Sequence, residues 1–158
     1  MKPKIVIFDL DGTLIDCTDR YYQTYRDVLH QYRLKAPKKE ELIKLRRLTG
    51  MSTREILSSY LIPRDLKKRD ELVPEIAEKR IVMFEDWTYL KLDNTFPGVE
   101  ETLEKLLGMD IALMLVTARR NRGNLIRQLE EKDLEKYFGK ILCRNEFRER
   151  SYTILPVL

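Results

Sequence analysis

Two aspartates near the start of the chain are the residues best suited to chemistry. Asp9 and Asp11 directly follow a short apolar run, residues 4–8. In an extended segment, side chains two residues apart point to the same side, about 6–7 Å apart along the chain. Two neighbouring carboxylates at a partly desolvated strand end are costly unless one is protonated or a cation lies with them. Because oxygen ligands favour Mg²⁺, we expect a magnesium site here; the alternative is a plain Asp-Gly turn after a strand.

Polar residues that follow a second apolar run could bind an oxyanion. Thr117 ends the run 111–116, and three arginines come soon after it: Arg119, Arg120 and Arg122. Arginines and the N–H groups of a helix start both favour an anion such as phosphate. Parallel strands end at one edge of a sheet, where ligands bind, so Thr117 is expected near Asp9. The alternatives are that Thr117 only finishes a strand and that the arginines point into solvent.

Hydrophobic patterning predicts the elements that would position these residues. Apolar runs at residues 4–8, 111–116 and 140–143 indicate strands. Helical periodicity predicts helices near 97–107 and 125–138, and Gly108 is expected to close the first in a left-handed conformation. Strands that alternate with helices through short loops indicate an α/β fold with a Rossmann-like parallel sheet.

An all-helical insertion interrupts this alternation. Helices are expected near 21–32, over 40–48 and over 53–61, the last beginning with a capping box of Ser52 and Glu55. A further helical stretch, 65–87, contains Pro74, which we expect to end or kink the helix at the residue before it. The expected domains are an α/β core, residues 1–18 and 93–158, and a helical cap, residues 19–92.

Composition and charge exclude several classes of protein. The 158 residues suit one compact domain, or a small core that carries an insertion. The longest apolar run, 111–116, is far shorter than the roughly 20 residues of a membrane span, and the N-terminal run breaks at Asp9, too early for a secretory signal. We therefore expect a cytoplasmic protein. A net charge of +4 indicates a solvated surface and does not favour nucleic-acid binding.

The cysteine and histidine content excludes further mechanisms. Cys17 and Cys143 cannot make a disulfide framework or a four-cysteine zinc site, and both are expected to be buried. The single histidine, His30, excludes mechanisms that need two.

The residues around Asp9 and Thr117 resemble the haloacid dehalogenase (HAD) superfamily. Residues 5–16, Ile-Val-Ile-Phe-Asp-Leu-Asp-Gly-Thr-Leu-Ile-Asp, resemble its first motif, and Leu-Val-Thr at 115–117 resembles its second. Residues 96–99 resemble the lead-in after the cap of many phosphatase members, and 134–142 the stretch before the third motif. The helical insertion lies where this family carries a C1 cap, as in enzymes of the phosphoglycolate phosphatase and β-phosphoglucomutase type.

This resemblance implies a Mg²⁺-dependent phosphate monoester hydrolase that acts on a small phosphorylated metabolite. Asp9 would attack the phosphate to give an aspartyl-phosphate, and Asp11 would alternate as acid and base. Mg²⁺ would be held by the Asp9 carboxylate and the main-chain carbonyl of Asp11. The residues expected around the phosphate are Gly12, Thr13, Thr117, Ala118 and Arg119.

The resemblance also concerns the insertion. Arg46 and Arg47, with the turn that begins at Gly50, resemble the cap loop that faces the active site and selects the substrate in this family. The alternative interpretation is a helix end with solvated arginines.

After Cys143 the chain departs from the family's pattern, because the lysine of the third motif and the acidic pair of the fourth are absent. The chain could be a fragment of a longer phosphatase. Alternatively, residues 152–158 could add a substitute strand, with Lys140 or Arg144 replacing the lysine and Glu146 or Glu149 the acids. A third interpretation is a degenerate member that binds a phosphorylated ligand or a protein partner without turnover.

The missing region would also change the sheet. In this family the fourth strand pairs with the first, so without it residues 5–8 form an uncovered edge, through which a homodimer could assemble.

Overall fold

The structure is a computed structural model that describes residues 4–149, with side chains described as far as Glu146. It divides into two compact units. The α/β unit comprises the residues before Cys17 and those after Asp93, and the helical unit comprises Cys17–Asp93. Each unit has a hydrophobic core of its own, and each is described by itself below.

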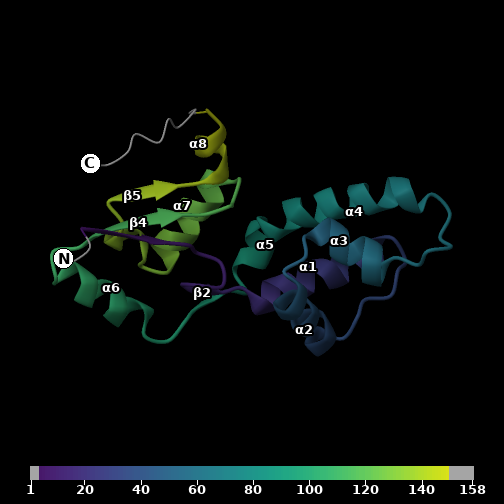
Figure 1. Cartoon of the computed structure of the whole chain (residues 1–158), viewed down its shortest axis with the longest axis horizontal. Coiled ribbons are helices and arrows are strands. Elements are labelled where there is room, and N and C mark those ends of the chain that lie inside the picture. Colours follow the sequence, from purple (N-terminus) through teal and green to yellow (C-terminus); the bar gives the residue numbers. More distant parts are fainter. Residues whose placement is uncertain (1–3, 150–158) are drawn as a thin grey trace. The chain divides into compact units, whose positions relative to one another are not determined.

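A three-stranded parallel sheet forms the centre of the α/β unit. Its strands are β1 (Ile5–Phe8), β4 (Ala112–Val116) and β5 (Lys140–Leu142), in the order β1-β4-β5 (Figure 1). Phe8 is in register with Leu115, which is in register with Ile141. The three strands lie where the apolar runs predicted them, and the α/β fold class is confirmed.

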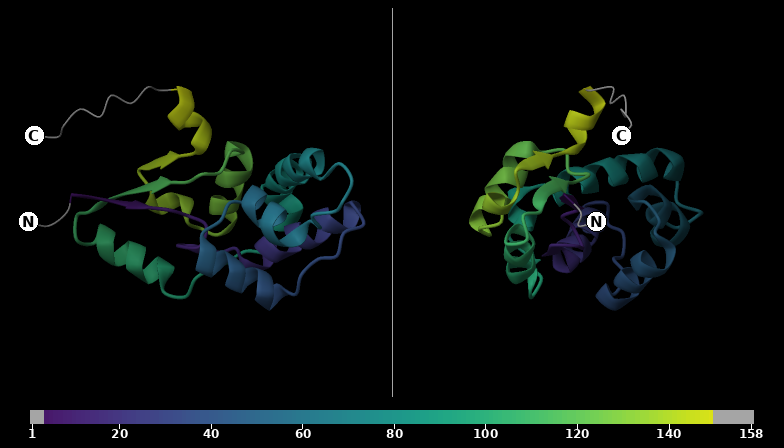
Figure 2. Two further views of the ribbon diagram at one scale, coloured as in Figure 1. Left: turned by 45° about the vertical axis from the view of Figure 1, so that its right-hand side comes forward. Right: turned by 60° about the vertical axis from the view of Figure 1, so that its left-hand side comes forward.

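Helices α6 (Val99–Leu107) and α7 (Arg122–Glu131), with the 3₁₀ turn η2 (Glu135–Tyr137), pack on this sheet (Figure 2). Short strands β2 (Ile15–Asp16) and β3 (Asn94–Thr95) form an antiparallel pair, and helix α8 (Arg144–Glu149) follows β5. The core is made of leucines from every layer, among them Leu103, Leu113, Leu115, Leu125 and Leu129. This single core explains why the apolar spacing of the sequence located the elements.

The two faces of the sheet differ. Strand residues that face α6 and α7, such as Leu113 and Leu115, are 2% and 0% exposed. On the opposite face, Ile5 and Ile7 of β1 are 53% and 62% exposed, and Ile7 is in register with Met114. β1 is also an edge strand among the described residues. A parallel sheet normally has both faces covered, so this apolar face and edge are unusual.

The helical unit contains five α-helices among its residues. They are α1 (Thr18–Gln31), α2 (Lys39–Thr49), α3 (Thr53–Ile56), which continues into the π-helical turn η1 (Leu57–Leu61), α4 (Arg69–Phe84) and α5 (Trp87–Leu90). The capping box is confirmed, since Ser52 Oγ accepts from the Glu55 N–H at 3.3 Å and Glu55 accepts from the Ser52 N–H at 2.8 Å. No helix within residues 4–149 has the length and apolarity of a membrane span.

Three details of the helix predictions are wrong. The stretch 125–138 is not one helix, because α7 ends at Glu131 and the separate turn η2 follows. Pro74 does not end its helix, because α4 runs through it to Phe84. Pro74 is the sixth residue of α4, so it removes one backbone hydrogen bond of the helix interior, a loss that the rest of this 16-residue helix tolerates. The other expected effect, a kink, stays a prediction. Gly108 is right-handed at φ −63°, and the left-handed residue after α6 is Asp110 at φ 61°. Aspartate tolerates this conformation better than most residues, so the chain turns at Asp110, two residues after Gly108.

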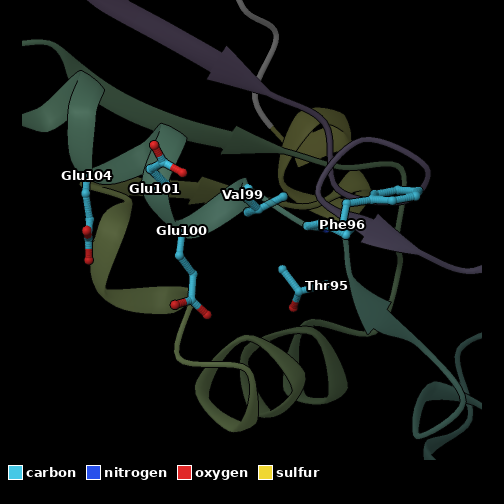
Figure 3. A pocket seen from close by; sticks show the side chains of 8 residues that line it. Thr95, Phe96, Val99, Glu100, Glu101 and Glu104 are labelled. Atoms are coloured by element: carbon cyan, nitrogen blue, oxygen red, sulfur yellow. The ribbon is translucent and has the colours of Figure 1, made fainter.

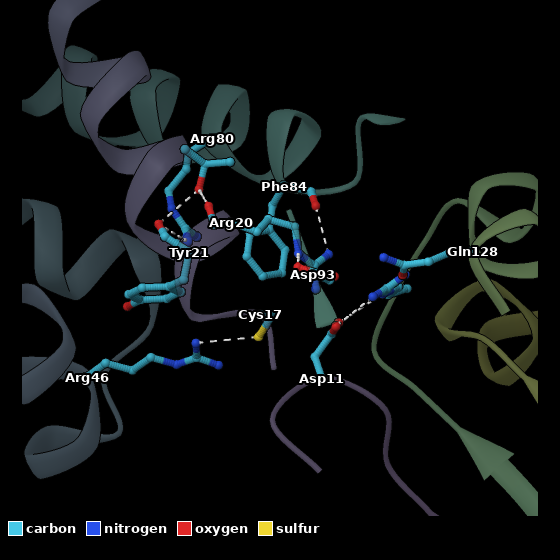
Figure 4. Close-up of polar contacts among 11 residues, drawn as sticks. Asp11, Cys17, Arg20, Tyr21, Arg46, Arg80, Phe84, Asp93 and Gln128 are labelled. Carbon is cyan, nitrogen blue, oxygen red and sulfur yellow. Dashed lines mark hydrogen bonds and ion pairs between the residues drawn. The ribbon is translucent and has the colours of Figure 1, made fainter. Parts of the chain in front are cut away.

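Buried arginines cross the core of the helical unit. Arg20 is paired with Asp93 at 3.0 Å, and both side chains are 0% exposed. Arg80 packs among aromatic rings, with its guanidinium carbon 3.9 Å from the centre of Tyr25 and 5.0 Å from that of Phe84. Both arginines therefore contribute to the packing of α1 against α4 (Figure 4).

Candidate active site

The sequence-predicted site residues of the α/β unit gather at one edge of the sheet. Asp9 and Asp11 follow the carboxyl end of β1, and Thr117 follows that of β4. Because Phe8 is in register with Leu115, Asp9 lies level with Val116, one residue before Thr117. This edge is where open α/β sheets bind their ligands.

A tight turn follows Asp9 and fixes the direction of Asp11. The buried Leu10 offers its carbonyl to three N–H groups, those of Thr13, Leu14 and Ile15, at 3.0–3.2 Å. Gly12 has φ +84°, a conformation that glycine adopts without strain, and its N–H donates to the Ile15 carbonyl at 2.8 Å. The N–H groups of Gly12 and Thr13 are thus used inside the turn, although both residues are exposed.

The two aspartates have different surroundings. Asp9 is exposed, and no hydrogen bond or ion pair holds its carboxylate among the described residues. Asp11 is 17% exposed and forms a two-point pair with Arg119, whose Nη2 and Nε donate to its two oxygens at 2.6 and 2.9 Å (Figure 4). The positive charge expected beside these acids is therefore supplied, for Asp11, by an arginine.

Arg119 is itself held on several sides. Its side chain is 3% exposed, and its Nη1 donates to Oε1 of the buried Gln128 on α7 at 2.6 Å. Its N–H lies 3.4 Å from the Thr117 hydroxyl, and its carbonyl accepts from the Arg144 N–H at 2.9 Å. Sequence reasoning placed Arg119 at the phosphate and missed Gln128. The contact between Arg119 and Asp11 has no local signal in the sequence, since the two residues are 108 positions apart. No motif marks Gln128, nine residues after Arg119, as its partner.

The remaining predicted phosphate residues lie on the same loop. Thr117 is buried, with its N–H bonded to the Leu142 carbonyl at 3.0 Å, and Ala118 beside it is exposed. Their roles toward a phosphate stay predictions.

The predicted cap-loop residues belong to the helical unit. Arg47 is exposed near the end of α2, and Gly50 caps that helix in the left-handed conformation at φ 61°. Arg46 lies with its guanidinium carbon 4.2 Å from the Tyr21 ring centre and donates to Cys17 Sγ at 3.8 Å. The sulfur is buried, as predicted for both cysteines.

The residues considered as substitutes for the missing motifs have other surroundings. Lys140 opens β5, so it lies at the amino end of its strand, away from the carboxyl edge. Arg144 is exposed directly after β5. Glu146 accepts from the Cys143 N–H at 2.7 Å and from Arg122 at 2.9 Å, and the backbone bond, with help from Arg122, lowers the pKa of its carboxyl. The side chain of Glu149 and residues 152–158 lie outside the described residues.

An open pocket of about 480 Å³ lies elsewhere in the α/β unit, at the start of α6. It is lined by residues 95–101 and Glu104, and its three glutamates point in different directions (Figure 3). None of the predicted catalytic residues lines it.

The described residues offer a partial set of ligands for Mg²⁺. Asp9 provides a carboxylate that has no partner within residues 4–149, and the main-chain carbonyl of Asp11 lies two residues along the chain. The Asp11 carboxylate is occupied by Arg119. Within the described part of the chain, no group of three or more acidic, cysteine or histidine side chains is arranged so that it could hold a metal ion. This set fits Mg²⁺, which commonly binds one or two carboxylates and keeps several waters.

Comparison with known proteins finds relatives that are named phosphatases. The chain is 37% identical over 143 residues to "Phosphorylated carbohydrates phosphatase" of Thermotoga maritima, with 90% of this chain and 62% of that protein covered. It is 25% identical over 150 residues to "Phosphoglycolate phosphatase" of Vibrio parahaemolyticus, covering 93% and 64% of the two chains. The chain thus spans less than two thirds of the length of these relatives.

A solved structure has the same fold. The "HAD-superfamily hydrolase, subfamily IA, variant 1" of Geobacter sulfurreducens matches with a TM-score of 0.66 at 19% identity, covering 91% of this chain and 64% of that one. The family model for haloacid dehalogenase-like hydrolases matches residues 6–154, nearly the whole chain. The chain therefore belongs to the haloacid dehalogenase-like hydrolase family.

Proposed function

We propose that this protein is a Mg²⁺-dependent phosphate monoester hydrolase that works through an aspartyl-phosphate on Asp9 and acts on a small phosphorylated metabolite. The observation that carries the proposal is the exposed carboxylate of Asp9 at the carboxyl edge of the sheet, which no described residue pairs with. A nucleophile needs such access to the phosphorus. The names of the two phosphatase relatives are consistent with this chemistry.

In the first step, an oxygen of Asp9 attacks the phosphorus. The bond from Asp9 to phosphorus forms as the bond to the leaving oxygen breaks, and the leaving oxygen takes the proton of the Asp11 carboxyl. In the second step, water attacks the phosphorus and passes its proton to the Asp11 carboxylate, and inorganic phosphate leaves Asp9.

Thr117 would contribute to binding of the phosphate. The Thr117 hydroxyl lies at the end of the neighbouring strand, where it would donate to a phosphate oxygen. A Mg²⁺ held by the Asp9 carboxylate and the Asp11 carbonyl would neutralise charge on the phosphoryl group. The helical unit, including Arg47 and Gly50, would select the substrate.

The proposal is tested by hydrolysis of 4-nitrophenyl phosphate with and without Mg²⁺. We expect turnover that needs Mg²⁺, and Asp9→Asn should lower kcat by about a thousandfold or more, because the amide is a poor nucleophile. The control is Asp110→Asn, an exposed aspartate of the same unit, which should keep full activity.

Activity that persists in Asp9→Asn would exclude the nucleophile assignment. A chain without turnover whose melting temperature rises with phosphate and Mg²⁺ would instead support the alternative, a member that binds phosphorylated ligands without hydrolysing them.

A further inference from the structure

Asp11, Arg119 and Gln128 form a continuous chain of contacts behind the proposed catalytic edge. The guanidinium uses Nε and Nη2 for the two oxygens of Asp11 and Nη1 for the side-chain carbonyl of Gln128. Arg119 and Gln128 are 3% and 1% exposed, so the arrangement lies largely within the core. A buried two-point pair of this kind fixes the plane of the carboxylate as well as its distance.

The backbone of Arg119 is anchored too. Its N–H and carbonyl contact the Thr117 hydroxyl and the Arg144 N–H, which come from the ends of β4 and β5. The guanidinium is thus carried by the sheet and supported by α7, two rigid elements. A group fixed in this way can hold Asp11, which lies on a turn, in one orientation.

We propose that Arg119 is the positioning residue of Asp11, which it orients for proton transfer with Gln128 as its support. This inference rests on the proposed function, in which Asp11 is the acid and base.

The expected effect follows from the part that orientation plays in proton transfer. A general acid or base contributes about 10²- to 10⁴-fold to a rate, and a displacement of about 1 Å can remove much of it. The loss should depend on the leaving group. An alkyl phosphate needs a proton on its leaving oxygen, whereas 4-nitrophenolate leaves readily without one.

The test is Arg119→Lys, which keeps the positive charge but loses the planar fork. The measurement is kcat/KM for 4-nitrophenyl phosphate and for a simple alkyl phosphate, since this ratio includes the steps up to departure of the leaving group. We expect a fall of about 10- to 100-fold for the alkyl ester and less than about threefold for the aryl ester. Arg127→Lys, on the exposed side of α7, is the matched control and should change neither value.

A merely structural role for Arg119 would lower kcat/KM equally for both esters, and this result would overturn the inference. A rise for the alkyl ester would also overturn it, because the guanidinium would then restrain Asp11. Wild-type protein that hydrolyses neither ester would overturn the proposed function, and this inference with it. Thermal melting of each variant shows whether it is folded. If Arg119→Lys is not folded, the second variant is Gln128→Met, which removes the acceptor of Nη1. It should lower kcat/KM for the alkyl ester more than for the aryl ester, and an equal fall for both would overturn the inference.

Discussion

The two units bury arginine in different ways. In the α/β unit, the guanidinium of Arg119 lies against a carboxylate and an amide, with three N–H···O contacts of 2.6–2.9 Å. In the helical unit, Arg80 lies 3.9 Å from the centre of the Tyr25 ring and donates to the Thr53 hydroxyl at 2.8 Å. No carboxylate contacts Arg80 among residues 4–149. Burial lowers the pKa of its guanidinium.

The different contacts of Arg119 and Arg80 indicate different roles, orientation of a carboxylate for Arg119 and packing of the core for Arg80. A carboxylate accepts from a guanidinium in a defined plane, so the pair at Arg119 holds one geometry. Aromatic faces attract a cation over a broad area and restrict its direction less. Arg20 combines both modes, since it pairs with Asp93 and stacks 4.0 Å from the Phe84 ring centre. We therefore associate the pair at Arg119 with the site and Arg80 with the stability of the helical unit.

The largest effect is expected at the fully buried pair of Arg20 and Asp93. Asp93→Asn keeps the shape of the side chain but leaves the Arg20 charge without its counter-ion. We expect a loss of about 3–5 kcal/mol in the free energy of unfolding, measured by urea titration. Asp86→Asn, which keeps a good capping residue at the start of α5, is the control. A loss below about 1 kcal/mol for Asp93→Asn would show that stacking, and not the ion pair, stabilises Arg20.

Arg119→Met should have the next largest effect on stability. It removes the donors of Asp11 and Gln128, and Gln128 is buried, so its carbonyl would lose its partner. Because Asp11 is 17% exposed and can be hydrated, we expect a loss of about 2–3 kcal/mol, below that for a fully buried pair. An unchanged midpoint of unfolding in urea would contradict the interpretation that the contacts among Asp11, Arg119 and Gln128 stabilise the fold.

Arg80→Met provides the direct contrast. Methionine keeps an apolar side chain against the Tyr25 and Phe84 rings and removes a buried charge that has no carboxylate partner. We expect a change within about 1 kcal/mol in either direction, from the same urea measurement. If Arg80→Met and Arg119→Met destabilise the protein equally, the distinction between the two arginines fails.

The smallest effect is expected at the exposed pair of Arg122 and Glu146. The pKa of Glu146 is lowered in the folded state, so its contribution is present above the ordinary glutamate pKa and is lost as pH falls through the folded value. Glu146→Gln should cost less than about 1 kcal/mol at pH 7, and less at pH 3 than at pH 7. Thermal melts of both proteins at the two pH values measure this. A difference that grows toward pH 3 would contradict the assigned sign.

Local patterns predicted much of the fold. Continuous apolar runs indicated the three strands because such runs are typical of parallel sheets, although one face of β1 is exposed here. The Ser52–Glu55 box located the start of α3. The sequence predicted the ends of helices less well, as Gly108 and Pro74 show. Glycine and proline restrict the backbone locally, but neighbouring residues decide whether the chain turns there.

The candidate site could be predicted only in part. The position of Asp9 and Thr117 at one sheet edge follows from strand order, which the alternating pattern implies. The pairing of Asp11 with Arg119 joins residues 108 positions apart, and Gln128 lies nine residues after Arg119 on the next helix. Contacts of this kind depend on how side chains fill the core, and no spacing in the sequence encodes them.

The exposed isoleucines of β1 have a thermodynamic consequence. Ile5 and Ile7 lie on an edge strand whose outward backbone groups can pair with a further strand. A separate molecule that adds such a strand binds the folded chain and not the unfolded one. By mass action, a higher concentration of that molecule raises the melting temperature of the protein. If a second copy supplies that strand, the stability of the protein becomes a function of its own concentration.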